Sequence, residues 1–419
     1  NREVPLVYFN LYLDGGQLLE TPDQTGISNI LAELMNKGTR NKTPEELEKA
    51  IKQLGSSIRF SSSQEYITVS GLSLAKNYRK TMALLEEMLL EPRWDEAELE
   101  LIRKSVESRL AQQAGNPNAI ARLEFDKLIY GEGDIRSLNR LGTREYVGSI
   151  EMTDLKTFYE KAFNPAAARL HIVGAVDQSE VLASLASLDD RWPKQEVIPL
   201  HIPDPKPFEK ASIYFYDVPD AKQSVIVLGY PALAETDEEF YHDNVMNYIL
   251  GGGGFASRLT QELRVEKGYT YGIRSSFSGS SRKGPFNIST SVQSKITLDA
   301  AQSIQNIIQD YGNTYTEADL ATTKGYLIKS NARRFESAYA KLNLLDKISA
   351  YNWTPAYIRD REEIVKNMTV ERIRELAQKY LDQAAMGWIV VGDARTQMKA
   401  LTALGHGDPV LLNAMPEAK

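Results

Sequence analysis

The chain has 419 residues, of which 42% are hydrophobic and 25% charged, with a formal net charge of −7. Its length predicts two domains or more, and its acidic balance disfavours a nucleic-acid partner, whose phosphates demand a basic patch. It contains no cysteine, which excludes disulfides, thiolate metal sites and thiol nucleophiles, and no apolar run approaches the roughly 18 residues of a membrane span.

The first half opens with a predicted buried strand at Val4–Leu13, followed by a helix at about residues 26–37. The helix carries apolar residues at i, i+3, i+4, i+7 and i+8, which mark its core face: Ile27, Ile30, Leu31, Leu34 and Met35. Its other face, toward solvent or a cleft, therefore presents Asn29, Ala32, Glu33 and Asn36.

Further elements follow at regular intervals. Thr43, Pro44 and Glu46 form a capping box with proline at the first helical position, which predicts a helix running to Gly55. Residues 58–72 alternate as strands do. The remaining predictions are helices at about 76–90, 95–114 and 152–162, and a strand at 169–176.

A proline-rich stretch separates two similar halves. Five prolines between Trp192 and Phe208 predict a stiff linker. His171–Leu185 (HIVGAVDQSEVLASL) is echoed by Ile389–Leu401 (IVVGDARTQMKAL), and the WDEAEL segment from Trp94 by YTEADL from Tyr315, each roughly 220 residues apart. We therefore expect two homologous α+β domains, each a mostly antiparallel sheet packed with helices, at residues 1–195 and 211–419, joined by a linker at 196–210.

The most informative stretch of the second half is LGGGGFASRLTQELRVEKGYTYGIRSSF, which runs from Leu250 to Phe277. Four glycines, Gly251, Gly252, Gly253 and Gly254, disfavour a helix and predict a flexible or closely approached loop. A short amphipathic helix then carries Arg264 and ends at Gly268, and alternating residues predict a strand that carries Tyr271. This order can bring the Arg264 guanidinium and the Tyr271 hydroxyl to one edge, as two donors without a base.

Familiar catalytic signatures are missing from the sequence. No two of the four histidines, His171, His201, His242 and His406, have the spacing of a helical metal site, so a zinc site of histidines alone is not expected. Nucleophile elbows, P-loops and dinucleotide fingerprints do not occur in their required contexts, and the glycine run lacks the G-K-[ST] ending of a phosphate cradle.

The duplicated α+β domain, the helix ending in NKGT at Thr39, and above all LGGGGFASRLTQELRVEKGYTYGI resemble the pitrilysin or insulinase-type zinc peptidases, the inverted zincins. This family includes the mitochondrial processing peptidase and the core subunits of the respiratory cytochrome complex. The resemblance covers essentially the whole chain and implies a processing-peptidase-like fold.

The resemblance also shows what this chain lacks. Active members carry H-x-x-E-H on the first helix, where two histidines bind zinc and the glutamate activates water, and a later helix supplies a third, glutamate ligand. Counted from Thr39, the histidine positions hold Asn29 and Glu33 and the general-base position holds Ala32, while the later glutamate corresponds to Glu107. Since asparagine is a poor zinc ligand and alanine cannot take a proton, we expect no metal site in this chain.

The resemblance assigns Arg264 and Tyr271 to the arginine and tyrosine that the second half of such enzymes directs at the substrate. The arginine would bind a peptide carbonyl and the tyrosine would donate to the developing oxyanion. Gly251 to Gly254 and Phe255 would touch substrate near the chamber entrance. The alternatives are Arg264 paired with a surface carboxylate, Tyr271 packed in the sheet, and a glycine hinge without a binding role.

The resulting hypothesis is a complementary, zinc-free half of a clamshell metalloendopeptidase that acts on peptides. Zinc and the general base would come from a partner, either a homologous subunit or the N-terminal half of the same polypeptide. The start at Asn1 favours removal of an upstream segment. An exported, periplasmic location is expected from bacterial relatives with paired halves. The alternative is a structural or binding subunit of the same fold with no catalytic role.

Overall fold

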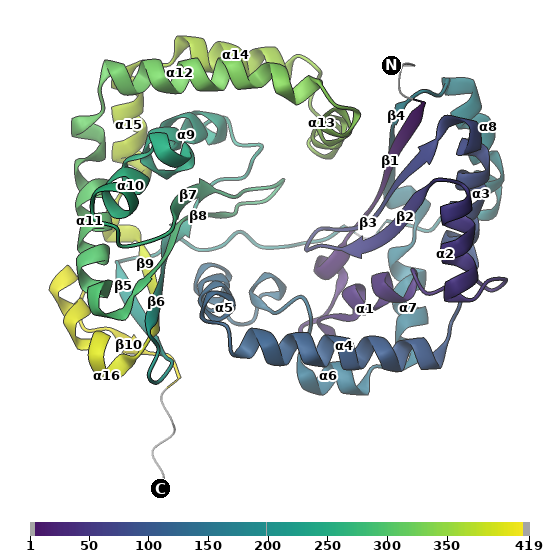
Figure 1. The fold of residues 1–419 in the computed structure, drawn as a ribbon, viewed down its shortest axis with the longest axis horizontal. Coiled ribbons are helices and arrows are strands. Elements are labelled where there is room, and N and C mark those ends of the chain that lie inside the picture. Colours follow the sequence, from purple (N-terminus) through teal and green to yellow (C-terminus); the bar gives the residue numbers. More distant parts are fainter. Residues whose placement is uncertain (1–4, 198, 414–419) are drawn as a thin grey trace, which may run out of the picture. The chain divides into compact units, whose positions relative to one another are not determined.

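The computed structural model of the chain describes residues 5–197 and 199–413 (Figure 1). Contacts divide these residues into two units. Unit 1 contains most of the first half of the chain together with Arg333–Asn352, and unit 2 contains most of the second half together with Gln113–Glu132. The main passage between them falls between Ile202 and Pro203, in the proline-rich segment. Three of the predictions include residues outside the described ranges. These are Val4 in the predicted first strand, residue 198 in the predicted linker, and residues 414–419 in the predicted second domain.

Unit 1 is built on a four-stranded, wholly antiparallel sheet in the order β2-β3-β1-β4. Its strands are β1 (Leu6–Asp14), β2 (Ser57–Ser62), β3 (Tyr66–Leu74) and β4 (Ala168–Gly174). The helices that it contains are α1 (Ile27–Leu34), α2 (Pro44–Gln53), α3 (Tyr78–Leu90), α4 (Glu96–Ala114), α6 (Arg144–Ser149), α7 (Met152–Ala162), α8 (Gln178–Arg191) and α13 (Ala338–Ala350). The core of the unit lies between one face of this sheet and the helices, with Phe9, Leu13 and Ile30 fully buried.

Unit 2 is built on a six-stranded sheet in the order β10-β5-β9-β6-β8-β7. The pairs β10–β5 and β5–β9 are parallel and the others antiparallel. Its strands are β5 (Ser212–Asp217), β6 (Gln223–Pro231), β7 (Ile273–Phe277), β8 (Pro285–Gln293), β9 (Gly387–Gly392) and β10 (Val410–Leu411). Its helices are α5 (Pro117–Tyr130), α9 (Phe240–Asn247), α10 (Arg258–Thr260), α11 (Thr297–Thr314), α12 (Glu317–Asn331), α14 (Tyr357–Asn367), α15 (Val370–Tyr380) and α16 (Ala394–Gln397).

The two units share an α+β plan, which confirms the predicted fold class. In each, a central strand pairs antiparallel with its neighbours on both sides: β1 with β3 and β4, and β6 with β8 and β9. The echoed WDEAEL and YTEADL segments open equivalent helices, since α4 begins at Glu96 and α12 at Glu317. The repeat in the sequence therefore corresponds to a repeat of structure.

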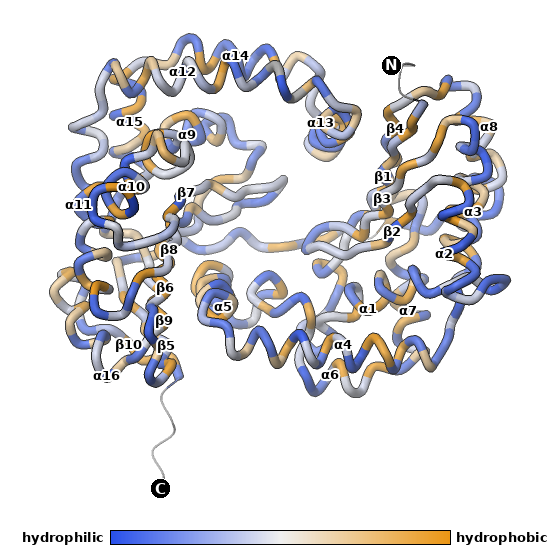
Figure 2. The backbone as a smooth tube through the Cα atoms, in the orientation of Figure 1, coloured by the Kyte–Doolittle hydropathy of each residue, from blue (hydrophilic) through white to orange (hydrophobic). Residues whose placement is uncertain are grey.

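Two helices belong to the unit that is formed mainly by the other half of the sequence. Helix α5 packs on β6 and β9 of unit 2, and α13 packs on β4 and β1 of unit 1. Apolar residues recur along α5 (Figure 2), and its buried Ala121, Phe125 and Ile129 form a small cluster with Val225 and Ile389. The sequence analysis predicted neither helix, and it expected two contiguous domains.

Candidate functional site

Helix α1 carries three of the predicted site positions, and its first turn is held by Glu20. The Glu20 carboxylate accepts hydrogen bonds from the backbone N–H groups of Gly26, at 2.8 Å, and Ser28, at 2.9 Å. Burial raises the pKa of Glu20, although these bonds favour its charged form. Because Gly26 lies in the left-handed region with φ 101°, the chain can turn sharply into the helix.

The less buried face of α1 holds a closed polar network in place of a metal site. The Asn29 Nδ2 atom donates to Glu33 Oε1 at 3.1 Å, and the Arg109 guanidinium, from α4, reaches the same oxygen at 2.5 Å. Ala32 is 1% exposed and packs in the core, which corrects its prediction as part of the solvent or cleft face. Asn36, predicted on that face too, is half-buried, and it is bonded to Phe60 of β2 through both backbone groups, at 2.9 and 3.0 Å.

Glu107, the residue predicted at the third ligand position, lies apart from this network. Its carboxylate lies near Gly148 in α6, where an added Cβ would be 3.6 Å from Glu107 Oε1. Within the described ranges no hydrogen bond or ion pair joins Glu107 to α1. The α4 side chain that reaches α1 is Arg109.

These residues do not fit a zinc ion. A zinc site needs three or four deprotonated or neutral donors directed at one point, and here the single carboxylate on α1 is already bound by a guanidinium and an amide. Across residues 5–197 and 199–413, no three histidine, cysteine or acidic side chains come together as metal ligands.

In unit 2, the glycine run, predicted as a flexible or closely approached loop, is helical at its start and approached closely by a strand. Gly251 and Gly252 end a π-helical turn, Tyr248–Gly252, that continues α9 directly. The close approach lies at Gly251, where an added Cβ would lie 2.3 Å from Ser275 Oγ and 2.6 Å from its backbone N, both in β7. Only Gly254, with φ 57°, adopts the left-handed conformation of the four, and it begins a 3₁₀ turn that carries Phe255. The predicted close approach is therefore found at Gly251, whereas the prediction that glycine ends the helix was wrong for Gly251 and Gly252.

Asn247 fixes the end of α9 to the strand that follows the glycine run. Its Nδ2 atom donates to the Ser275 backbone oxygen at 2.9 Å, and the Ser275 hydroxyl donates to its Oδ1 atom. This clamp parallels the Asn36 clamp in unit 1, because each asparagine joins the end of a helix to an edge strand. The sequence analysis did not identify Asn247 as important.

Arg264 lies on an exposed turn and stacks on Phe255. The turn is a π-helix, Gln261–Glu266, rather than the predicted α-helix. Its apolar face is nonetheless buried, since Leu259 and Leu263 are both 0% exposed. The guanidinium carbon lies 4.7 Å from the Phe255 ring centroid, a cation–π distance. Arg264 makes no hydrogen bond or ion pair with any described residue, so its donors remain available.

Tyr271 lies outside the strand that was predicted to carry it. Strand β7 begins at Ile273, and Tyr271 occupies a bend before it with 93% of its surface exposed. Gly268, at φ 63°, ends the preceding helical turn as predicted. The Thr270 hydroxyl donates to the Gly272 carbonyl at 2.9 Å and so shapes the bend. Among the described residues the Tyr271 hydroxyl has no hydrogen-bond partner.

Unit 2 also contains a buried acidic side chain, that of Asp243. Asp243 in α9 is 0% exposed, and neither carboxylate oxygen has a hydrogen-bond partner among the described residues. Burial, reinforced by the negative charge of Glu239, raises the pKa of Asp243 to about 8, while Lys379 and Arg372 oppose the shift. Glu239 itself accepts bonds from Lys379, Tyr380 and Arg372, which lower its pKa to about 2.

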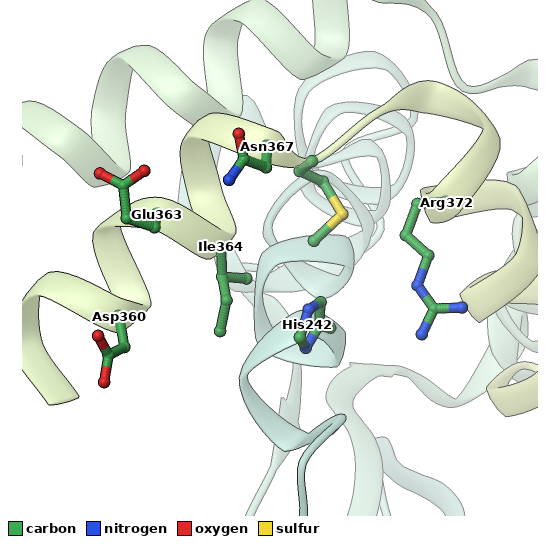
Figure 3. A pocket seen from close by; sticks show the side chains of 7 residues that line it. His242, Asp360, Glu363, Ile364, Asn367 and Arg372 are labelled. Carbon is green, nitrogen blue, oxygen red and sulfur yellow. The ribbon is translucent and has the colours of Figure 1, made fainter.

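A pocket of about 380 Å³ opens next to α9 in unit 2 (Figure 3). It is lined by His242, Asp360, Glu363, Ile364, Asn367, Met368 and Arg372. Its charged groups have partners elsewhere, such as Lys366 for Glu363 and Glu239 for Arg372. None of the predicted site residues lines this pocket.

Comparison with known proteins agrees with this fold and with the altered site. Residues 1–131 match the model of the insulinase peptidase family M16, and residues 149–327 match the model described as the peptidase M16 inactive domain. The chain belongs to the M16 peptidase family. It is a member of the inactive-domain type, and members of the M16 family usually work as paired homologous halves.

Individual relatives are distant but cover most of the chain. The non-peptidase homolog YmxG of Helicobacter pylori is 24% identical over 82% of this chain and 79% of its own length. The uncharacterized zinc protease YmxG of Bacillus subtilis is 23% identical over 82% of each chain. The crystal structure of a peptidase M16 inactive domain from Pseudomonas fluorescens superimposes with a TM-score of 0.87 over 95% of each chain, at 24% identity. No helix among the described residues is long and apolar enough to cross a membrane.

Proposed function

We propose that this chain is the zinc-free half of a two-part M16 peptidase. Arg264 and Tyr271 bind the peptide and stabilise the charge that develops when water attacks the scissile carbonyl. A partner half with an intact H-x-x-E-H motif supplies zinc and the general base. The proposal does not depend on whether that half is a separate subunit or part of the same polypeptide.

One observation carries the proposal: two strong donors lie in one sequence motif, and both are left unpartnered. Arg264 stacks on the Phe255 ring, and neither its guanidinium nor the Tyr271 hydroxyl has a hydrogen-bond partner among the described residues. A guanidinium and a phenol without hydrogen-bond partners can donate to a carbonyl oxygen of the substrate, because no existing hydrogen bond has to break first. Among the described residues no histidine or carboxylate is hydrogen-bonded to either side chain, so the proposal takes the general base from the partner half.

A second candidate is a binding subunit with no catalytic role. It is favoured by the closed network around Glu33 and by the match to an inactive domain. In that case Arg264 and Tyr271 would hold a peptide without affecting its hydrolysis.

The experiment mixes this chain with its H-x-x-E-H homologue and follows a quenched fluorescent peptide. We expect turnover by the mixture, and a strong loss with Arg264→Ala or Tyr271→Phe in this chain. Arg274→Ala and Tyr326→Phe are matched controls, since both side chains are exposed in unit 2. Turnover that is unchanged by both site variants would favour the binding subunit.

A further inference from the structure

The network on α1 has a feature that a merely degraded metal site would lack: it contains its own cation. The Arg109 guanidinium lies 2.5 Å from Glu33 Oε1, and Asn29 donates to the same oxygen from one helical turn earlier, at 3.1 Å. Both charged side chains are about one-third exposed, at 38% for Arg109 and 32% for Glu33. The ion pair is therefore partly shielded from solvent. A charge-assisted hydrogen bond between Arg109 and Glu33 is stronger there than it would be in full contact with water.

The geometry of α4 explains why a cation, and not a carboxylate, reaches α1. Residues 107 and 109 are two positions apart on one helix, which places their side chains roughly 200° apart around its axis. Glu107 approaches Gly148 of α6, and Arg109 reaches Glu33. Helix α4 therefore directs positive charge at the position where a metal would need a third ligand.

This arrangement opposes a divalent ion in two ways. A metal at Glu33 would have to displace the guanidinium from its carboxylate, and it would then lie beside a fixed positive charge. The Arg109 Nε atom is buried and has no hydrogen-bond partner in the described part of the chain, so the bond to Glu33 is the one that this guanidinium would lose to a metal.

We propose that the Arg109 guanidinium takes the place of the metal ion in this chain, and that it keeps the α1 site closed to divalent cations. The α1 site is thus occupied by the Arg109–Glu33 ion pair. Metal ligands introduced on α1 alone therefore do not restore metal binding while Arg109 remains. This inference is independent of the role proposed for Arg264 and Tyr271, because it concerns the chain without a partner.

The test rebuilds the motif in the full chain and titrates it with Co²⁺, whose visible absorption reports tetrahedral binding. One variant combines Asn29→His, Ala32→Glu and Glu33→His and keeps Arg109 and Glu107; a second adds Arg109→Glu. We expect the second to bind Co²⁺ on the order of 100-fold more tightly than the first. Lys104→Glu in place of Arg109→Glu is the control, since it makes the same charge change on an exposed position of α4 and should leave the affinity of the first variant unchanged.

Equal, tight binding by both variants would show that Glu107 completes the site, and would overturn the proposal. The proposal would also be overturned if neither variant bound Co²⁺ although circular dichroism showed that both variants were folded. If the rebuilt variants fail to fold, a double-mutant cycle of Arg109→Met and Glu33→Gln, followed by urea unfolding, replaces them. We expect a coupling between the two changes that exceeds that of the surface pair Lys104 and Glu100, and additive effects would contradict the ion pair.

Discussion

Asp243 carries a carboxyl group that has no hydrogen-bond partner among the described residues. It lies in α9, within the segment FYHDNVMN, and the structure buries it completely. The charged or titratable groups that face it come from three elements: Glu239 at the start of α9, Tyr230 in β6, and Arg372, Lys379 and Tyr380 in α15. The positive groups are engaged with Glu239, so Asp243 remains protonated at neutral pH.

This burial predicts how stability depends on pH. The pKa of Asp243 is about 8 in the folded chain and about 4 when unfolded, so between these values the folded state binds more protons. The contribution of Asp243 is therefore largest below about pH 4 and is lost as the pH rises to 8. Asp243→Asn should remove this dependence and stabilise the protein at pH 8 by about 1–3 kcal/mol.

Urea unfolding of both proteins from pH 5 to pH 9 measures the effect. Asp360→Asn, at an exposed position of α14, is the control and should leave the pH profile unchanged. Parallel profiles for the Asp243→Asn variant and the native chain would show that Asp243 is ionised or hydrated in the fold.

Two elements are fixed by asparagine clamps: α1, which carries the Glu33 network, and α9, which precedes the glycine run. Asn36 ties the end of α1 to Phe60 in β2, and Asn247 ties the end of α9 to Ser275 in β7. Both bonds satisfy backbone groups of edge strands, which would otherwise have no partner.

Loss of a clamp should destabilise its unit. Asn247→Ala removes bonds from a residue that is 4% exposed, and we expect a loss of about 1–3 kcal/mol in the free energy of unfolding. Asn244→Ala, which removes only a bond to Phe240 within the same helix, should cost less. Equal losses in urea unfolding would mean that the clamp to β7 contributes nothing.

Sequence periodicity predicted several helices of the first half closely, but it did not predict α5 or α13, which are of similar length. The bounds predicted for α3, α4 and α7 lie within two residues of the structure, and the core face of α1 is buried as predicted. The π-helical turns around Gly251 and Arg264 were missed because periodicity does not distinguish such short turns from ordinary helix. The Asn247 clamp was missed because its partner lies 28 residues further on.

At the scale of the whole molecule, each unit depends on a helix from the opposite half of the sequence. Helix α5 contributes an apolar surface to unit 2, centred on Phe125. Helix α13 packs on β4 and β1 of unit 1, where burial and the negative charge of Asp346 raise the pKa of Tyr12 in β1 to about 12. No local pattern reveals such an exchange, since it exists only through tertiary contacts, and the sequence therefore predicted two contiguous domains.

The exchange predicts a long-range effect of a core substitution. Phe125→Ala leaves a cavity beneath the sheet of unit 2 and should cost about 3–5 kcal/mol. Hydrogen exchange should accelerate in β6 and β9, although both lie about a hundred residues or more beyond Phe125 in the sequence. Leu101→Ala, at an exposed position of α4, is the control. Unchanged protection of both strands would contradict the assignment of α5 to unit 2.

We propose that this chain supplies half of a peptidase active site. The most direct test is the steady-state kinetics of the complex with the zinc-bearing half, with Tyr271→Phe in this chain. If the hydroxyl donates to the oxyanion, kcat should fall on the order of 100-fold while KM changes little. An unchanged kcat, with an intact complex, would contradict the claim.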